Sequence, residues 1–254
     1  MILQKNIRSK MEKTQALLDH PVISQHIPEI AWYDTKTLEE MLTRYRSIYI
    51  KPDRGRQGNR IIRLKRADEF DWVLSHNGTS KIMPQPDIPS ELESIMTKKK
   101  YIIQQGVDMA TYNKCPFDIR MVLHKPYETW DLTLTSAKVA FREDAVVTNV
   151  AKGARDYPLI KVLRNYDQKK DPMATIRDLV SAALQICNIL GSKFPLRIIG
   201  LDMAVDKKGK IWFIEANTQP QCARLKRLND KSTRKRYKEA INKIASDVLQ
   251  ERES

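Results

Sequence analysis

The chain has 254 residues, enough for one large domain or two closely packed subdomains with a hydrophobic core. Its 45 Lys and Arg residues outnumber 31 Asp and Glu residues, and the resulting net charge of +14 points to a polyanionic partner as one class of function. The sequence has no apolar run of about 18 residues that would span a membrane, no apolar secretory start, and only three widely separated cysteines, so we expect a cytoplasmic protein with reduced thiols.

A strand that ends in a lysine is predicted at residues 47–52, where Ser-Ile-Tyr-Ile precedes Lys51 and a proline. The segment after it contains Gly55 and Gly58 and leads to a return strand at residues 61–64. Backbone N–H groups of such a loop can surround phosphate oxygens, and Lys51 would add a positive charge. The alternative is a plain hairpin turn, which needs glycine for conformational reasons alone.

Helices are predicted at residues 37–45 and 89–98, and the stretch 76–89, with one glycine and three prolines, is predicted to be a loop. A strand at residues 101–105 then stops at Gly106.

An alternating strand is expected at residues 117–123, with Asp118 and Arg120 on one face. Opposite charges in this spacing more often pair with each other at a surface than bind a ligand.

Two longer helices follow. The first has Asp171 as its cap and Pro172 in its first turn, and it is predicted to end at Gly191. The second begins with the basic run 234–238, and its predicted apolar face consists of Tyr237, Ile241, Ile244, Ala245 and Val248. A solvated basic surface is the simplest interpretation of that run, and non-specific binding of a polyanion is the alternative.

Acidic residues lie on two strands predicted at residues 197–205 and 210–216, joined by a short polar connection. Glu215 and Asn217 are two residues apart and therefore share a face. With Asp202 they supply the oxygens that Mg²⁺ takes from proteins when phosphate oxygens complete its shell. An ordinary hairpin with a polar solvent face is the alternative.

The order of these segments resembles the ATP-grasp superfamily and, more narrowly, the YheC/YheD family of endospore-coat-associated ATP-grasp proteins. The resemblance covers about residues 30–225 and rests on motifs at residues 30–33, 51–60, 101–107, 117–123, 148–153 and 212–220. It implies an α+β fold in which two α+β subdomains with mostly antiparallel sheets clamp the nucleotide. A helical lead-in would occupy residues 1–35, the N-terminal subdomain residues 36–105, and the C-terminal subdomain, with the metal site and the basic helix, residues 106–254.

The same resemblance implies binding of ATP with Mg²⁺, or with Mn²⁺ in its place. Lys51 would contact the α and β phosphates under the loop that runs from Gly55 to Gly58, and Asp118 would take the ribose hydroxyls. The adenine hinge would be formed by backbone groups of Gln104, Gln105 and Val107. The metal ligands would be Asp202, Glu215 and Asn217, and the catalytic residues at the transferring phosphate would be Arg120, Lys138 and Asn149.

The implied chemistry is ATP-dependent activation of an unidentified carboxylate as an acyl phosphate, followed by attack of an amine or thiol. Most ligases of the superfamily carry an α/β domain ahead of this core, and none is expected before residue 30 here. Two other functions stay open at this point: a non-catalytic, ATP-binding structural protein of the spore coat, and a basic protein associated with nucleic acid.

Overall fold

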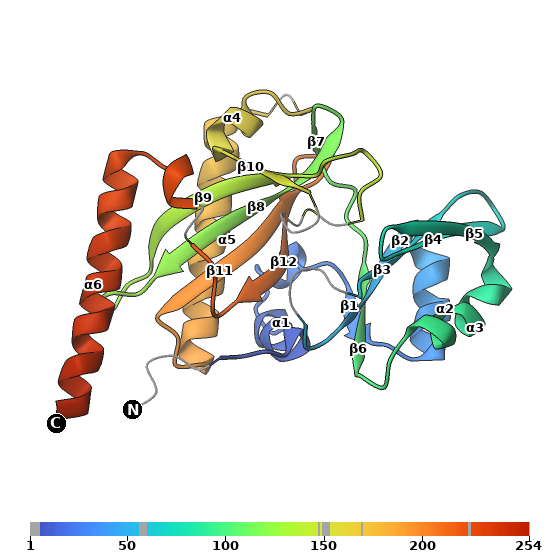
Figure 1. Cartoon of the computed structure of the whole chain (residues 1–254), viewed down its shortest axis with the longest axis horizontal. Coiled ribbons are helices and arrows are strands. Elements are labelled where there is room, and N and C mark those ends of the chain that lie inside the picture. The colour runs from blue at the N-terminus through green and yellow to red at the C-terminus, as the bar shows by residue number, and fades with distance from the viewer. Residues whose placement is uncertain are drawn as a thin grey trace.

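The computed structural model describes residues 6–55, 60–146, 148, 153–168, 170–222 and 225–253, with side chains described as far as residue 247. Two antiparallel sheets, each packed against helices, form the two halves of the protein (Figure 1). The α+β class and the mostly antiparallel strands expected from the sequence are confirmed.

The first sheet has the strand order β1-β6-β2-β3-β4-β5. Its strands are β1 (Ile30–Trp32), β2 (Ser47–Pro52), β3 (Ile62–Arg66), β4 (Asp71–His76), β5 (Thr79–Pro84) and β6 (Tyr101–Gln105). The helices α2 (Thr35–Arg44) and α3 (Ile88–Ile95) belong to this half, with a 3-10 turn at Gln85–Asp87 ahead of α3. Leu38, Met41, Ile48, Ile50 and Trp72 are fully buried in its core.

The loop prediction for residues 76–89 was wrong, because β4 and β5 form a hairpin there. The turn consists of Asn77 and Gly78, which both have positive φ angles, 50° and 88°. A two-residue Asn-Gly turn of this kind follows the twist of the flanking strands, and it is a strong short-range signal for a hairpin. The prolines that favoured a loop lie at the end of β5 and beyond it.

The second sheet has the order β10-β9-β8-β11-β12, and the short strand β7 pairs with the start of β8. Its strands are β7 (Thr111–Tyr112), β8 (Cys115–His124), β9 (Asp131–Val139), β10 (Arg155–Tyr157), β11 (Ile198–Val205) and β12 (Ile211–Asn217). Its helices are α1 (Lys10–Leu18), α4 (Leu159–Leu163), α5 (Pro172–Lys193) and α6 (Lys231–Glu253), with 3-10 turns at Ser24–His26 and Leu225–Leu228.

Alternation along β8 divides its side chains between two faces. Phe117, Ile119, Met121 and Leu123 are buried in the core shared with α5 and α1. On the opposite face Val122 packs beneath α6, next to Tyr237. Asp118 and Arg120 lie on that same face but closer to the start of the strand, and this leaves a polar area between α6 and the first sheet.

Helix α5 begins at its predicted cap, since the Asp171 side chain accepts hydrogen bonds from the N–H groups of Met173 and Ala174. It does not end at Gly191 but continues to Lys193. A Cβ atom at Gly191 would lie 3.0 Å from Cζ2 of Trp130, so the glycine allows close packing. By length and composition α5 is also the one described helix that could span a membrane, yet its Leu179-to-Leu190 face belongs to the core.

The final helix α6 packs through a narrower apolar face than predicted. Tyr237, Ala240 and Ile244 are buried, whereas Ala245 is exposed. The reason is helical geometry: positions three, four and seven residues after Tyr237 lie on its face, and the eighth turns away from the sheet. Val248 lies beyond the described side chains.

Candidate functional site

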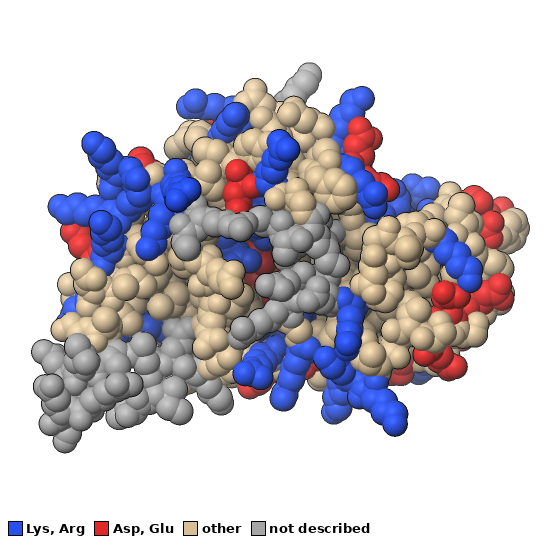
Figure 2. All heavy atoms as spheres, viewed as in Figure 1, with Lys and Arg blue, Asp and Glu red and all other residues tan. Residues whose placement is uncertain are grey.

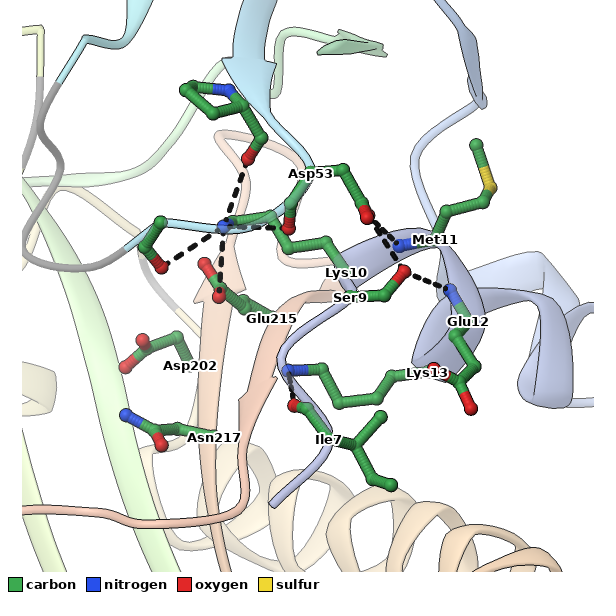
Figure 3. Close-up of polar contacts among 12 residues, drawn as sticks. Ile7, Ser9, Lys10, Met11, Glu12, Lys13, Asp53, Asp202, Glu215 and Asn217 are labelled. Atoms are coloured by element: carbon green, nitrogen blue, oxygen red, sulfur yellow. Dashed lines mark hydrogen bonds and ion pairs between the residues drawn. The ribbon is translucent and has the colours of Figure 1, made fainter. Parts of the chain in front are cut away.

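Asp202 and Glu215 occupy directly paired positions on the antiparallel strands β11 and β12. Asn217 pairs with Gly200 two positions further along the same ladder. Figure 3 shows Asp202, Glu215 and Asn217 extending toward the same side of this hairpin. The structure therefore brings the three predicted metal ligands together.

A β-bulge gives Glu215 its orientation. The register changes between Asp202 and Met203, which pairs with Phe213, so Ile214 is the extra residue on β12. Ile211 and Phe213 point into the core before the bulge, and Ala216 does so after it. Without the extra residue, strict alternation would turn Glu215 into the core, and the bulge places it on the polar face instead.

Two cross-strand charge pairs lie on the same face. Asp118 on β8 is paired in register with Lys138 on β9, and the ammonium of Lys138 lies 2.8 Å from the carboxylate. Arg120 is paired in register with Asp202 and donates two hydrogen bonds to it, Nε to Oδ1 at 2.6 Å and Nη2 to Oδ2 at 3.0 Å. Lys138 also reaches Oδ1 of Asp202, at 3.1 Å. Asp118 and Arg120 on β8 therefore do not pair with each other, because each has its partner on a neighbouring strand.

Burial and charge act differently on the two aspartates. Burial raises the pKa of Asp118, and the ammonium of Lys138 only partly offsets this. Burial would raise the pKa of Asp202 too, but the charges of Arg120 and Lys138 outweigh it and lower that pKa. Asp202 is consequently the carboxylate that stays ionised over the wider pH range.

Lys51 approaches this face from the end of β2 in the first sheet. The residue is only 6% exposed, and its ammonium makes no hydrogen bond or ion pair with any residue that the structure describes. Desolvation by burial lowers its pKa to about 8, although the negative charges of Glu215 and Asp202 act in the opposite direction. A buried cation without a partner is unfavourable, and a site that contains one is suited to an anion.

A second lysine at the site, Lys10, was not predicted. It lies in the first turn of α1, and its ammonium is 3.7 Å from Oε1 of Glu215 (Figure 3). The same ammonium donates to the backbone oxygens of Pro52, Asp53 and Gly55, at 3.2, 3.4 and 3.4 Å. The sequence signals the helix itself, because Ser9 and Glu12 have the spacing of a capping box and Ser9 accepts from the Glu12 N–H. It does not signal that the lysine is buried.

The expected adenine hinge lies where β6 ends. Gln104 sits inside the sheet, paired with Ile30 on one side and Tyr49 on the other. Gln105 and Gly106 donate their N–H groups to Glu29 and Ser47. The N–H of Val107 makes no hydrogen bond with a described residue, so among these residues Val107 offers the backbone donor for a ligand.

Thr148 and Gly153 are the described members of the motif at residues 148–153, and the Thr148 hydroxyl donates to the buried carboxylate of Asp118. Asn149 and Gly58, which were predicted to approach the phosphates, lie outside the described residues. Gly55 is described, and its carbonyl oxygen accepts from Lys10.

The donor set is suited to Mg²⁺ bound together with a nucleotide. In the described part of the chain, no group of three or more His, Cys, Asp or Glu residues has an arrangement that could hold a metal ion by itself. Asp202 and Glu215 with the amide of Asn217 form a smaller set of hard oxygen donors. Mg²⁺ is commonly held by one or two carboxylates and by the oxygens of its phosphate substrate, so the residues present fit this ion.

Comparison with known proteins identifies a family and two relatives by sequence. A family model described as YheC/D-like ATP-grasp matches residues 1–246. The endospore coat-associated protein YheD of Bacillus subtilis strain 168 is 28% identical over 192 residues, which are 72% of this chain and 41% of YheD. YheC of the same strain is 22% identical over 213 residues, 80% of this chain and 57% of YheC. The chain thus spans about half the length of these relatives.

Solved structures have a similar fold. D-cycloserine synthetase DcsG superposes with a TM-score of 0.57 at 12% identity, over 93% of this chain and 70% of that protein. The ATP-grasp ligase PsnB, solved with a phosphomimetic variant of its minimal precursor, Mg and ADP, gives a TM-score of 0.53 at 12% identity, over 93% and 59% of the two chains. At these identities the likeness concerns the fold.

Proposed function

Because the chain belongs to the YheC/D-like ATP-grasp family and has the ATP-grasp fold, we propose that it binds Mg-ATP between its two sheets and acts as an ATP-dependent ligase. A substrate carboxylate would attack the γ-phosphorus, which yields an acyl phosphate and ADP. An amine or thiol would then attack the acyl carbon, lose a proton and release inorganic phosphate. Each sheet with its helices would form one subdomain of the clamp.

The observation that carries this proposal is the state of Lys51. The residue is buried at the end of β2, its ammonium has no described partner, and the negative charges of Glu215 and Asp202 act on it. A phosphate oxygen would supply the missing counter-charge. Catalysis would then rest on positioning and charge neutralisation, as is usual for phosphoryl transfer.

The remaining polar residues have distinct roles in this proposal. Asp202, Glu215 and Asn217 would hold Mg²⁺, which would neutralise charge on the phosphate oxygens when bound. Arg120 and Lys138 now pair with carboxylates. If Asp202 were to bind Mg²⁺, Arg120 and Lys138 would be free to neutralise charge on the transferring phosphoryl group. The free N–H of Val107 would hydrogen-bond to the adenine ring.

Calorimetric titration of Mg-ATP tests the nucleotide site. We expect binding to the unaltered chain that requires magnesium and is lost in Lys51→Ala and in Glu215→Ala. Lys65→Ala, at an exposed position on the adjacent strand β3, and Glu128→Ala, at a fully exposed carboxylate, are matched controls that should bind as the unaltered chain does. An unaltered, folded chain that does not bind Mg-ATP would overturn the proposal.

Release of ADP and phosphate tests turnover. The assay would supply mixtures of carboxylates with amines or thiols, and would compare the unaltered chain with Glu215→Ala. The two similar proteins named endospore coat-associated favour a second candidate, a structural protein of the spore coat that binds ATP without turnover. Magnesium-dependent binding without ADP release under any mixture would select that candidate. A ligase would work in the cytoplasm, whereas the structural protein would accompany the coat.

A third candidate rests on the basic end of α6. Lys and Arg side chains gather there on the surface (Figure 2), and Arg234, Lys235, Arg236 and Lys238 are exposed. Attraction of a polyanion by this surface would weaken steeply with salt and would not depend on Glu215. DNA binding that Mg-ATP fails to displace would support a polyanion-binding role for α6, whether or not the chain also binds Mg-ATP.

A further inference from the structure

The ammonium of Lys10 is surrounded by oxygens from two parts of the fold. Three are backbone oxygens of Pro52, Asp53 and Gly55, at the end of β2 and just after it, and the fourth is the carboxylate of Glu215 on β12. The distances run from 3.2 to 3.7 Å, and Lys10 is only 8% exposed. A primary ammonium has three N–H donors, and three carbonyls receive them.

Four oxygens arranged in this way would bind a small cation, and here the ammonium of the Lys10 side chain takes that place. We call these four oxygens the Lys10 seat. Hydrogen bonds fix the helix that delivers the lysine. Oδ1 of Asp53 accepts from the Ser9 hydroxyl and from the Met11 N–H, both at 2.9 Å, so the seat and the first turn of α1 are held to the same segment. A carboxylate at a helix N-terminus is additionally favoured by the helix dipole.

The seat joins the phosphate side of the site to its metal side. Pro52 directly follows Lys51, and Glu215 belongs to the proposed metal set. We propose that Lys10 is a positioning residue whose ammonium fills a cation seat between the end of β2 and Glu215, and thereby sets the separation between Lys51 and the metal ligands. This inference rests on the proposed function, since the separation matters only if Lys51 and Glu215 serve one nucleotide.

Chemical rescue tests the seat. In Lys10→Ala the deleted atoms correspond to propylammonium, so added propylammonium can fill the vacated space, whereas tetramethylammonium has no N–H to donate. Lys10→Met is the matched control, because its side chain fills most of the space without a charge and leaves no room for the amine. Each protein would be studied by calorimetric titration of Mg-ATP and by thermal unfolding, with either cation or with sodium at equal ionic strength.

We expect Lys10→Ala to lose about tenfold or more in affinity for Mg-ATP, in line with truncation of one member of a buried charge pair. Propylammonium should restore affinity and raise the melting temperature in Lys10→Ala alone. If propylammonium had equal effects on Lys10→Ala, Lys10→Met and the unaltered chain, or no effect on Lys10→Ala, the proposed cation site at Lys10 would be wrong. If the unaltered chain does not bind Mg-ATP, the proposed function and the positioning role fall together. The melting temperature of Lys10→Ala with propylammonium then decides whether the seat itself exists.

Discussion

The guanidinium of Arg120 holds the carboxylate of Asp202 through two hydrogen bonds, at 2.6 and 3.0 Å. Their side chains are 16% and 19% exposed, so the pair is largely removed from water. One of these residues was predicted to bind metal and the other to approach phosphate. Each therefore pairs with a group that the proposed function assigns to a ligand, and binding of Mg-ATP would have to separate the pair.

Removing one partner should expose how much the pair contributes. In Arg120→Ala we expect the free energy of unfolding to fall by about 2–4 kcal/mol, because Asp202 keeps a buried charge with Lys138 as its remaining partner. Urea denaturation measures this. Arg142→Ala, which breaks an exposed pair with Asp144, is the control and should lose no more than about 1 kcal/mol. Equal losses in both variants would show that burial adds nothing.

Affinity for Mg-ATP should depend on the protonation of Lys51. Its pKa of about 8 means that the ammonium loses its proton as pH rises through that value, while a bound phosphate would favour the charged form. We expect affinity to fall above pH 8, by up to about tenfold per pH unit, and binding at pH 8 to 9 to take up a proton. Titrations in buffers with different ionisation enthalpies detect that proton. Lys51→Arg, which stays charged, should show neither effect.

Lys51 should also limit stability. Its folded pKa of about 8 lies below the ordinary 10.5, so the charged lysine opposes folding fully below pH 8, and this penalty disappears as pH rises toward 10.5. At pH 7, Lys51→Met should therefore raise the free energy of unfolding by about 1–3 kcal/mol while Mg-ATP binding is lost. The gain should shrink at pH 10. Urea denaturation at both pH values checks this, and a loss of stability at pH 7 would contradict it.

Gly106 should not tolerate a side chain. A Cβ atom there would lie 2.7 Å from Cβ of Ser47 and 2.8 Å from its backbone oxygen. Because the Gly106 N–H also donates to that oxygen, β2 and the chain after β6 would have to separate. We expect Gly106→Ala to cost about 1–3 kcal/mol in thermal or urea unfolding. Gly55→Ala, whose nearest atom is 3.8 Å away, is the comparison and should leave the free energy of unfolding nearly unchanged.

The β11–β12 hairpin could be predicted closely from the sequence. Strands expected at residues 197–205 and 210–216 are observed at Ile198–Val205 and Ile211–Asn217, because apolar alternation and a short polar turn are local signals. The partners of the charges could not be predicted. Asp118 and Arg120 pair with Lys138 and Asp202, and those pairs depend on which strands become neighbours in the sheet.

Lys10 shows a different limit. A lysine in the first turn of a helix is normally solvated, whereas this one is buried against the end of β2 and Glu215. The contact between Lys10 and Asp53 could not be predicted from the loop at residues 55–58, because α2 and β2 lie between these two residues in the sequence. Hydrophobic periodicity predicts where a helix packs more readily than which polar group it carries into a site.

The two covalent crossings between the halves lie beside each other. The chain leaves the core of the second sheet after Ile27 and returns to it by Ala110, and at this junction Gln105 and Glu29 exchange two hydrogen bonds, at 2.8 and 3.1 Å. The first sheet is therefore an insertion whose two ends lie side by side. Both covalent connections thus lie at one place, and the contacts of Lys10 with Pro52 and Glu215 join the two halves at a second place.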